Sequence, residues 1–298
     1  MKYCSSACHT EDWASHRLVC KNVGAARHQE LMPLMLAIKN GDVATVEKLL
    51  KAGAKVDGDA IFFYQEAPML TTPLFTAARA GHAAVIAVLL KAGAKINRTS
   101  AAGGFTPLFI AAQEGHTAAV SVLIGAGAEV DIMTVDQGTP LLVAAQQGHE
   151  AVLALLINAG ADVNHMGDDR CSPVYIAAQH GHKTVLAMLL KAGADVNSGR
   201  RDNGCTPLCL AAAQGHEAVL VALLEAGADV NHGRDTDGCT PLIFAARHGR
   251  EAVVVALLKA GAQMKAMDNG CTPLMAAMSR GHTSVVAALR RWTAGIHY

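Results

Sequence analysis

Residues 206–231 read TPLCLAAAQGHEAVLVALLEAGADVN, and this stretch decides the fold. Thr206 is a good N-cap residue, because its hydroxyl can accept a hydrogen bond from a free N–H of the first helical turn. Pro207 follows at the first helical position, where a missing N–H costs nothing. Gly215 separates this short helix from a second one, and Gly227 ends the second helix where a left-handed conformation is favoured. The stretch therefore predicts two short helices joined by a tight turn.

Near copies of this stretch fill most of the chain. The steps between the prolines of successive Thr-Pro or Ser-Pro pairs are 34, 33, 33, 34, 34 and 32 residues. A period of this size is the sequence signature of a helical repeat array, in which each unit buries its apolar surface only by stacking on its neighbours. The seven pairs are Thr72-Pro73, Thr106-Pro107, Thr139-Pro140, Ser172-Pro173, Thr206-Pro207, Thr240-Pro241 and Thr272-Pro273.

The repeated unit resembles the ankyrin repeat over about residues 31–296. The resemblance implies an all-α ankyrin-repeat solenoid of helix-turn-helix units with β-hairpin loops. A degenerate first copy spans Pro33–Asp57, and Arg290-Arg291 give the last copy a charged outer face, so both ends read as caps. We expect a linker helix at 21–30 and then about eight repeats near 31–58, 72–98, 106–132, 139–165, 172–198, 206–232, 240–265 and 272–296.

One position departs from the ankyrin motif in every copy. The family continues Thr-Pro-Leu with a histidine that ties neighbouring repeats together. Apolar packing is expected to replace that hydrogen bonding here, because the position holds Phe75, Phe109, Leu142, Tyr175, Cys209, Ile243 and Met275.

Composition excludes several classes of protein. The 25 basic and 25 acidic residues cancel, which argues against binding to nucleic acid or to an anionic membrane. No apolar run approaches the roughly 20 residues that span a bilayer. The polar, Cys-rich and His-rich N-terminus is unlike a secretory signal, so the eight cysteines are expected in a reducing compartment. We therefore expect a monomer that is cytoplasmic, nuclear or both.

Residues 1–20 hold a cluster of candidate metal ligands. The pairs Cys4/Cys8 and His16/Cys20 are each four residues apart, one helical turn, and thiolate and imidazole are the ligands of structural zinc. With Tyr3 and Asp12-Trp13, the segment is similar to the C-terminal half of a MYND-type zinc finger. That family binds two zinc ions through eight ligands, half of which would precede Met1. Either the chain is a truncated form of a longer protein, or the four residues hold one zinc ion themselves.

Two other rows of reactive side chains have structural explanations. The histidines that open the second helices occupy one repeat position, and Arg250 replaces the ring in one copy. The cysteines before the Ser/Thr-Pro pairs also recur in register, one repeat apart, which is too far for a disulfide. The histidines are His82, His116, His149, His182, His216 and His282, and the cysteines are Cys171, Cys205, Cys239 and Cys271.

The positions after the alanine pair of each first helix are the candidate partner-binding residues. In ankyrin arrays these positions and the hairpin tips build the concave face, and here they form a Gln-rich strip that turns basic toward the C-terminus. Its members are Arg79, Gln113, Glu114, Gln146, Gln147, Gln179, His180, Gln214, Arg247 and His248, followed by Ser279 and Arg280.

A second candidate is the aromatic run Phe62, Phe63 and Tyr64, in a long insert between the first two repeats. Exposed aromatic side chains are typical interface anchors. The alternative is that the run folds back over the first repeat or over the Cys/His segment.

The sequence therefore predicts a non-catalytic scaffold or adaptor that holds a protein or peptide ligand on the concave face. No nucleophile elbow, phosphate loop or His-Glu-x-x-His motif is present, so an enzyme is not expected. One alternative is a zinc-finger adaptor linked to transcription or chromatin, in which the MYND-like segment supplies specificity. Another is a regulatory subunit of an enzyme or a modification substrate. The turns at Asn164, Asn197 and Asn231 resemble those that asparagine hydroxylases accept in other ankyrin proteins.

Overall fold

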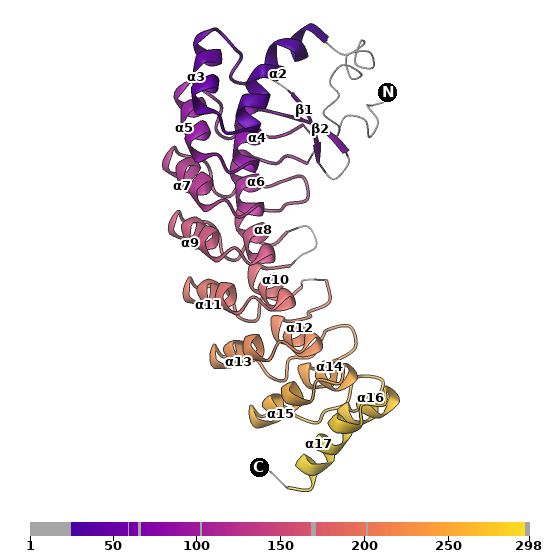
Figure 1. The fold of residues 1–298 in the computed structure, drawn as a ribbon. Coiled ribbons are helices and arrows are strands. Elements are labelled where there is room, and N and C mark those ends of the chain that lie inside the picture. Colours follow the sequence, from indigo (N-terminus) through magenta and orange to yellow (C-terminus); the bar gives the residue numbers. More distant parts are fainter. Residues whose placement is uncertain are drawn as a thin grey trace. The chain divides into compact units, whose positions relative to one another are not determined.

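The computed structural model describes residues 25–58, 60–64, 67–101, 103–167, 171–200 and 202–295. Residues 25–30, 60–64 and 67–70 are described by their backbone alone. The chain divides into two compact units, residues 1–140 and 141–298. Each unit consists of paired helices joined by tight turns, and each pair is followed by a loop that leads to the next pair (Figure 1).

In the described part of the first unit, inner helices α2, α4 and α6 contact one another in order, and outer helices α3, α5 and α7 do the same. A two-stranded antiparallel hairpin, β1–β2, lies between α3 and α4 in the sequence. The elements are α2 (Ala25–Lys39), α3 (Val43–Lys51), β1 (Ala60–Tyr64), β2 (Ala67–Thr71), α4 (Pro73–Arg79), α5 (Ala83–Lys91), α6 (Pro107–Gln113) and α7 (Thr117–Gly125).

The second unit repeats the arrangement. Inner helices α10, α12, α14 and α16 contact in sequence order, and so do outer helices α9, α11, α13, α15 and α17. The elements are α8 (Pro140–Gln147), α9 (Glu150–Asn158), α10 (Pro173–His180), α11 (Lys183–Lys191), α12 (Pro207–Gln214), α13 (Glu217–Glu225), α14 (Pro241–Arg247), α15 (Glu251–Lys259), α16 (Pro273–Ser279) and α17 (Thr283–Thr293).

The Thr-Pro pairs start the inner helices as predicted. The hydroxyl of Thr206 accepts a hydrogen bond from the N–H of Cys209 at 3.3 Å, and Pro207 is the first residue of α12. The same cap begins α4, α6, α10, α14 and α16, with Ser172 in place of threonine at α10. Each cap satisfies one N–H that a helix start would otherwise leave without a partner.

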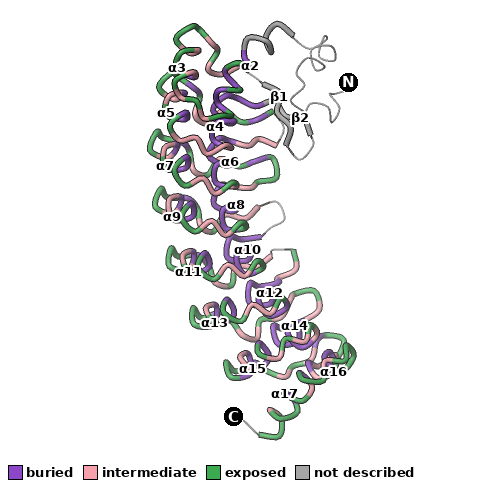
Figure 2. Tube along the Cα trace, viewed as in Figure 1, coloured by how far each residue is buried: buried purple, intermediate pink, exposed green. Residues whose placement is uncertain are grey.

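The core lies between the two rows of helices in each unit. The alanine pairs are fully buried, as are the apolar residues on one side of each outer helix, such as Val219, Leu220 and Leu223 of α13. Figure 2 shows this as buried inner helices beside outer helices that are buried on one side only. The small alanines let neighbouring inner helices approach closely, which is why seven- or eight-residue helices suffice.

Two features near the N-terminus differ from the expected outline. Helix α2 runs without a break through residues 30 and 31, where we expected the linker helix to end and the first repeat to begin. The aromatic run, expected in a loop, forms strand β1 instead, and Phe62 pairs with Met69 of β2. Ten apolar or small residues in two short runs can pair with each other without following the two-residue alternation that indicates a half-buried strand.

Candidate interaction surface

The predicted strip is held by the histidines of the following repeats. In the second unit, Nε2 of His182 lies 3.0 Å from the carbonyl oxygen of Gln146, and Nε2 of His216 lies 3.2 Å from that of Gln179. A carbonyl oxygen only accepts hydrogen bonds, so Nε2 is the protonated nitrogen of each ring. The bonds fix the backbone from which the strip side chains project.

Arginine performs the same task at the one repeat without this histidine. Nε of Arg250 donates to the carbonyl oxygen of Ala213 at 3.2 Å, beside Gln214 of the strip. This confirms that the histidine row is structural, because a side chain without acid–base chemistry replaces the ring. The same bond joins His282 to Arg247 and, in the first unit, His82 to Lys39 and His116 to Arg79.

These rings lie directly against the turn glycines. Gly181 has φ +76°, and a Cβ added there would lie 2.8 Å from the ring of His216. A larger residue at this turn would be strained and would also displace the ring. The glycine and the histidine of the next repeat therefore form one packing unit.

In the second unit the strip is open to solvent. Gln146 and Gln147 end α8, Gln179 and His180 end α10, and all four are exposed, as are Gln214 and His248. Arg247 is half-buried, and its Nη2 lies 3.3 Å from Sδ of Met267.

His180 differs electrostatically from the glutamines around it. Its ring stacks on that of His182 with centroids 5.9 Å apart. Although the residue is exposed, surrounding protein atoms partly desolvate its ring and lower the pKa of His180, and the neighbouring His182 and His216 lower it further. The ring is therefore neutral near pH 7 and offers one donor and one acceptor, as the glutamine amides do.

In the first unit the strip is shorter and more enclosed. Arg79 and Gln113 are half-buried, and Glu114 is exposed. Nε of Arg79 lies 4.0 Å from Oε1 of Glu114, so the charges of these two residues partly cancel. The aromatic candidates Phe62, Phe63 and Tyr64 lie in β1 of the same unit, and whether their side chains are exposed is outside the described part of the structure.

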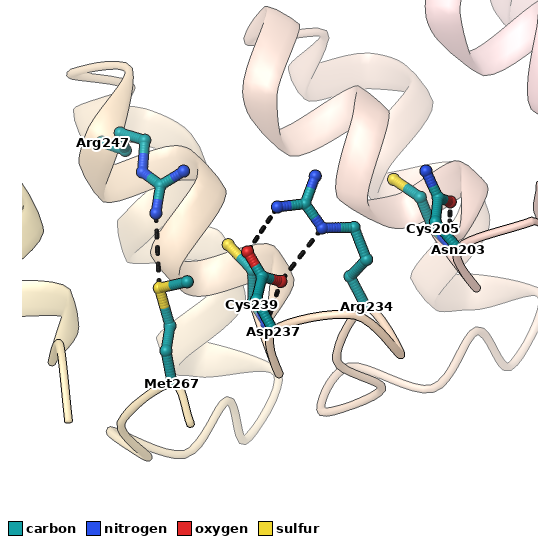
Figure 3. A network of polar contacts seen from close by, with 7 residues as sticks. All are labelled: Asn203, Cys205, Arg234, Asp237, Cys239, Arg247 and Met267. Atoms are coloured by element: carbon teal, nitrogen blue, oxygen red, sulfur yellow. Dashed lines mark hydrogen bonds and ion pairs between the residues drawn. The ribbon is translucent and has the colours of Figure 1, made fainter. Parts of the chain in front are cut away.

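The hairpin loops of the second unit carry a polar network that joins successive repeats (Figure 3). Nε of Arg234 donates to Oδ1 of Asp237 at 3.0 Å, and its Nη2 bonds the other carboxylate oxygen. The guanidinium also lies over the ring of Phe244, 5.3 Å from the centroid, in cation–π geometry. Oδ1 of Asp237 in turn accepts from the N–H of Cys239 at 3.1 Å. Arg234 is thus held in one orientation beside the inner helix.

The ion pair shifts the pKa values of both Arg234 and Asp237. The hydrogen bond from Arg234 lowers the pKa of Asp237, and the reciprocal bond raises the pKa of Arg234. Both charges therefore persist through the physiological pH range. Backbone bonds between successive hairpins reinforce the network, from Asp235 N–H to the Asn203 carbonyl and from Asp268 N–H to the Asp237 carbonyl.

The thiols in this region are buried rather than presented to solvent. Cys171, Cys205, Cys209 and Cys239 are buried, and Cys271 is half-buried. Burial raises the pKa of Cys239 to about 11, so this thiol stays protonated at neutral pH. At Cys205 a side-chain hydrogen bond with Cys209 lowers the pKa instead. The burial of these thiols supports a packing role for the row, and Cys209 packs in the core as expected of its position.

The candidate zinc ligands Cys4, Cys8, His16 and Cys20 lie outside the described residues. Within the ranges that the structure describes, no group of three or more His, Cys, Asp or Glu side chains is arranged to hold a metal ion.

Comparison with known proteins places this architecture. A family model described as "Ankyrin repeats (3 copies)" matches residues 6–100, 100–167, 141–233 and 227–297. The chain belongs to the ankyrin-repeat family. A solved structure, the ankyrin repeat domain of human ASB11, is similar at 28% sequence identity with a TM-score of 0.65, covering 76% of this chain and 97% of that one. A sequence search of curated proteins finds no match.

Membership of the family confirms the predicted fold and sets the broad class of function. Ankyrin repeats are in general non-catalytic protein–protein interaction modules. Among the helices described, none is long and apolar enough to cross a membrane.

Sequence reasoning did not find the Arg234–Asp237–Phe244 contact. The three residues come from a hairpin tip and the following inner helix of this ankyrin array, and only the fold brings them together. A weak signal was available, because Asp237-Gly238 precedes the Thr-Pro pair as Asn203-Gly204 does, and such pairs mark tight turns.

Proposed function

We propose that this ankyrin-repeat protein is a non-catalytic scaffold or adaptor that binds a protein or peptide on the surface formed by its inner helices and hairpins. The observation that carries the proposal is the exposed row at the ends of α8, α10, α12 and α14, whose backbone is fixed by the histidines and Arg250. A surface that is ordered before binding loses little entropy when a partner docks.

The chemistry of this surface favours a polar partner. The glutamine amides and the neutral ring of His180 donate and accept hydrogen bonds without carrying a charge. Arg247 and the oriented Arg234 add charged donors beside them. Arginine is enriched at protein interfaces, and an arginine that is already held in place binds at a lower entropic cost. We expect a peptide or loop that presents backbone carbonyls and one or two carboxylates.

Matched variants of the full chain test the proposal. Q179A, Q214A and R247A combined truncate one strip side chain in each of three successive repeats, whereas K183A, E217A and K259A combined truncate exposed side chains of the outer helices. Proteins captured from cells by each variant are identified by mass spectrometry, and the interaction is then remeasured with the purified partner. Loss of one partner in the strip variant alone supports the proposal. Equal retention in both variants contradicts it.

We also propose, as a second candidate, that the N-terminal segment binds zinc and contributes to partner choice in the cytoplasm or nucleus. The support is the sequence alone, which sets Cys4, Cys8, His16 and Cys20 as two pairs of typical zinc ligands. Metal analysis of the purified full chain, compared with C4S and H16A variants, tests this. About one zinc ion per chain, lost in both variants, is expected, and its absence from the wild-type chain contradicts the candidate.

A further inference from the structure

Helices α16 and α17 end the described array with a face that earlier repeats cover. Val286 of α17 is half-buried, whereas Leu220 and Val254, which hold the same repeat position in α13 and α15, are fully buried beneath the next repeat. Met275 of α16 is 57% exposed, although the corresponding Ile243 of α14 is completely buried. The end face is thus the surface that each repeat offers to the helices of its successor.

Two residues make this face unlike the others. Met278 stands where the second alanine of the pair stands in the other six repeats with a Thr-Pro or Ser-Pro start, and it is 54% exposed. Alanine at that position lets the next inner helix approach closely, and a methionine there holds it away. Arg290 stands where α13 and α15 have Leu224 and Leu258. A further repeat of the same type would therefore not pack here as it does inside the array.

Between the two helices lies an open groove of about 490 Å³. Its lining is mostly apolar and includes one basic side chain; it consists of Met278, Gly281, Thr283, Val286, Ala287 and Arg290. Methionine is flexible and polarisable, and it is frequent on surfaces that receive apolar side chains of varied shape. Exposed apolar surface bordered by polar residues is typical of an interaction site.

The last repeat itself carries charge of one sign. Residues 269–298 contain Arg280, Arg290 and Arg291 and no aspartate or glutamate, although the whole chain is neutral. All three arginines are exposed, and Nη2 of Arg291 lies 3.7 Å from Oε1 of Glu251 in the preceding repeat. A partner that places apolar residues on the methionines therefore meets positive charge at the edges of the groove.

We propose that this end face docks an amphipathic helix of another protein, with an apolar stripe flanked by acidic side chains. The shape argues for a helix, because α16 and α17 present the surface that receives the helices of a following repeat elsewhere in the array. The methionines argue for an apolar stripe, and the arginines argue for carboxylates beside it. Arg280 also ends the inner-helix strip, but the groove itself is lined by residues outside the strip, so its test is independent of the function proposed above.

The test is selection of peptides by the full chain. A display library of helix-forming 18-residue peptides is panned against the protein, and selected peptides are synthesised for fluorescence anisotropy. We expect enrichment of leucine, phenylalanine or methionine at helical spacing with aspartate or glutamate beside them. M278A is expected to weaken binding at least about five-fold, the effect of losing an interface anchor, and R290E is expected to do the same. M278A restores the residue found in the other repeats, so the fold is retained.

The control is M133A, which truncates a methionine that is 50% exposed in a hairpin of the first unit. It should leave the affinity unchanged. Enrichment of peptides without acidic residues, or equal affinity for wild type and M278A, overturns the proposal. So does sedimentation that shows a dimer lost in M278A, which would make a second copy the occupant. Binding to phosphatidylserine vesicles in place of peptide would make a membrane surface the occupant and would equally overturn it.

Discussion

At the scale of single residues, a histidine ring that opens an outer helix, such as His216 at α13, contributes to stability through one hydrogen bond to the preceding repeat. His216 bonds the carbonyl of Gln179 and packs on Gly181, while Arg250 makes the equivalent bond one repeat later. H216A should lower the free energy of unfolding by about 1–2 kcal/mol, because it leaves a carbonyl without its partner. H216R should recover most of that loss. Urea unfolding of the three proteins measures both effects.

The comparison between the two substitutions decides the cause. If H216R were as unstable as H216A, the imidazole itself rather than a donor at that place would be required. The structural interpretation of the histidine row would then be wrong.

The ion pair of Asp237 predicts a pH dependence. Its pKa is lowered in the folded protein by the bond from Arg234, so its contribution is present above the unfolded pKa of about 3.9 and is lost as pH falls through the lower folded value. Because the pair is partly exposed, the contribution is about 1 kcal/mol or less. D237N should therefore be slightly less stable than wild type at pH 7 and indistinguishable from it near pH 2. Urea unfolding at the two pH values, with D136N in an exposed turn as the control, checks this. If D237N were less stable than wild type by the same amount at both pH values, the carboxylate charge would contribute nothing to stability.

At the scale of elements, the loops after the outer helices are connected by a ladder of side-chain acceptors. Oδ1 of Asn197 accepts from the N–H of Asp229 at 3.1 Å, and Asn164 and Asn231 make the same bond one repeat earlier and later. In the first unit an aspartate, Asp57, takes this role toward Lys95. The natural exchange of Asn and Asp indicates that the acceptor oxygen is what matters.

Substitution at Asn197 tests the ladder. N197A should destabilise the protein by about 1 kcal/mol or less, since an exposed backbone N–H exchanges its acceptor for water, and N197D should cost less. Hydrogen exchange gives the specific readout, because the Asp229 amide should lose protection in N197A and keep it in N197D. Equal exchange of that amide in both variants would show that the loop is held by other contacts.

Elements also show what the sequence could and could not reveal. Local rules of capping and backbone conformation determine where the helices begin, at the Thr-Pro pairs, and where they end, at Gly215 and Gly227. These boundaries were therefore predictable. The β1–β2 hairpin was not, because its strands are apolar throughout and carry no alternation.

The candidate site divides in the same way. The exposure of the strip residues was predictable, because they occupy the same position after the alanine pair in each repeat. The Arg234–Phe244 contact and the open end face at Met278 depend instead on how a loop or helix meets its neighbours in three dimensions.

At the scale of the whole molecule, stability is expected to be a sum of terms between adjacent repeats. Helix α13 contacts α11 and α15 on either side and its own partner α12, as expected when each repeat packs only on the next. Such a chain can lose structure locally, and its compact units need not unfold together. The neutral overall charge adds no long-range repulsion that would couple distant repeats.

A cavity in one repeat should therefore destabilise the adjacent repeats, and this effect should decrease with distance along the chain. Leu220 of α13 is completely buried, and L220A should cost about 2–5 kcal/mol by removing core volume that the surroundings cannot refill. Amides of α11, α13 and α15 should exchange faster, while those of α5 and α7 in the first unit keep their wild-type rates. V221A, at a 39% exposed position of the same helix, should change none of them. Uniformly faster exchange across the chain in L220A would mean that the repeats unfold as one cooperative body, and nearest-neighbour packing would then fail to explain how this array is stabilised.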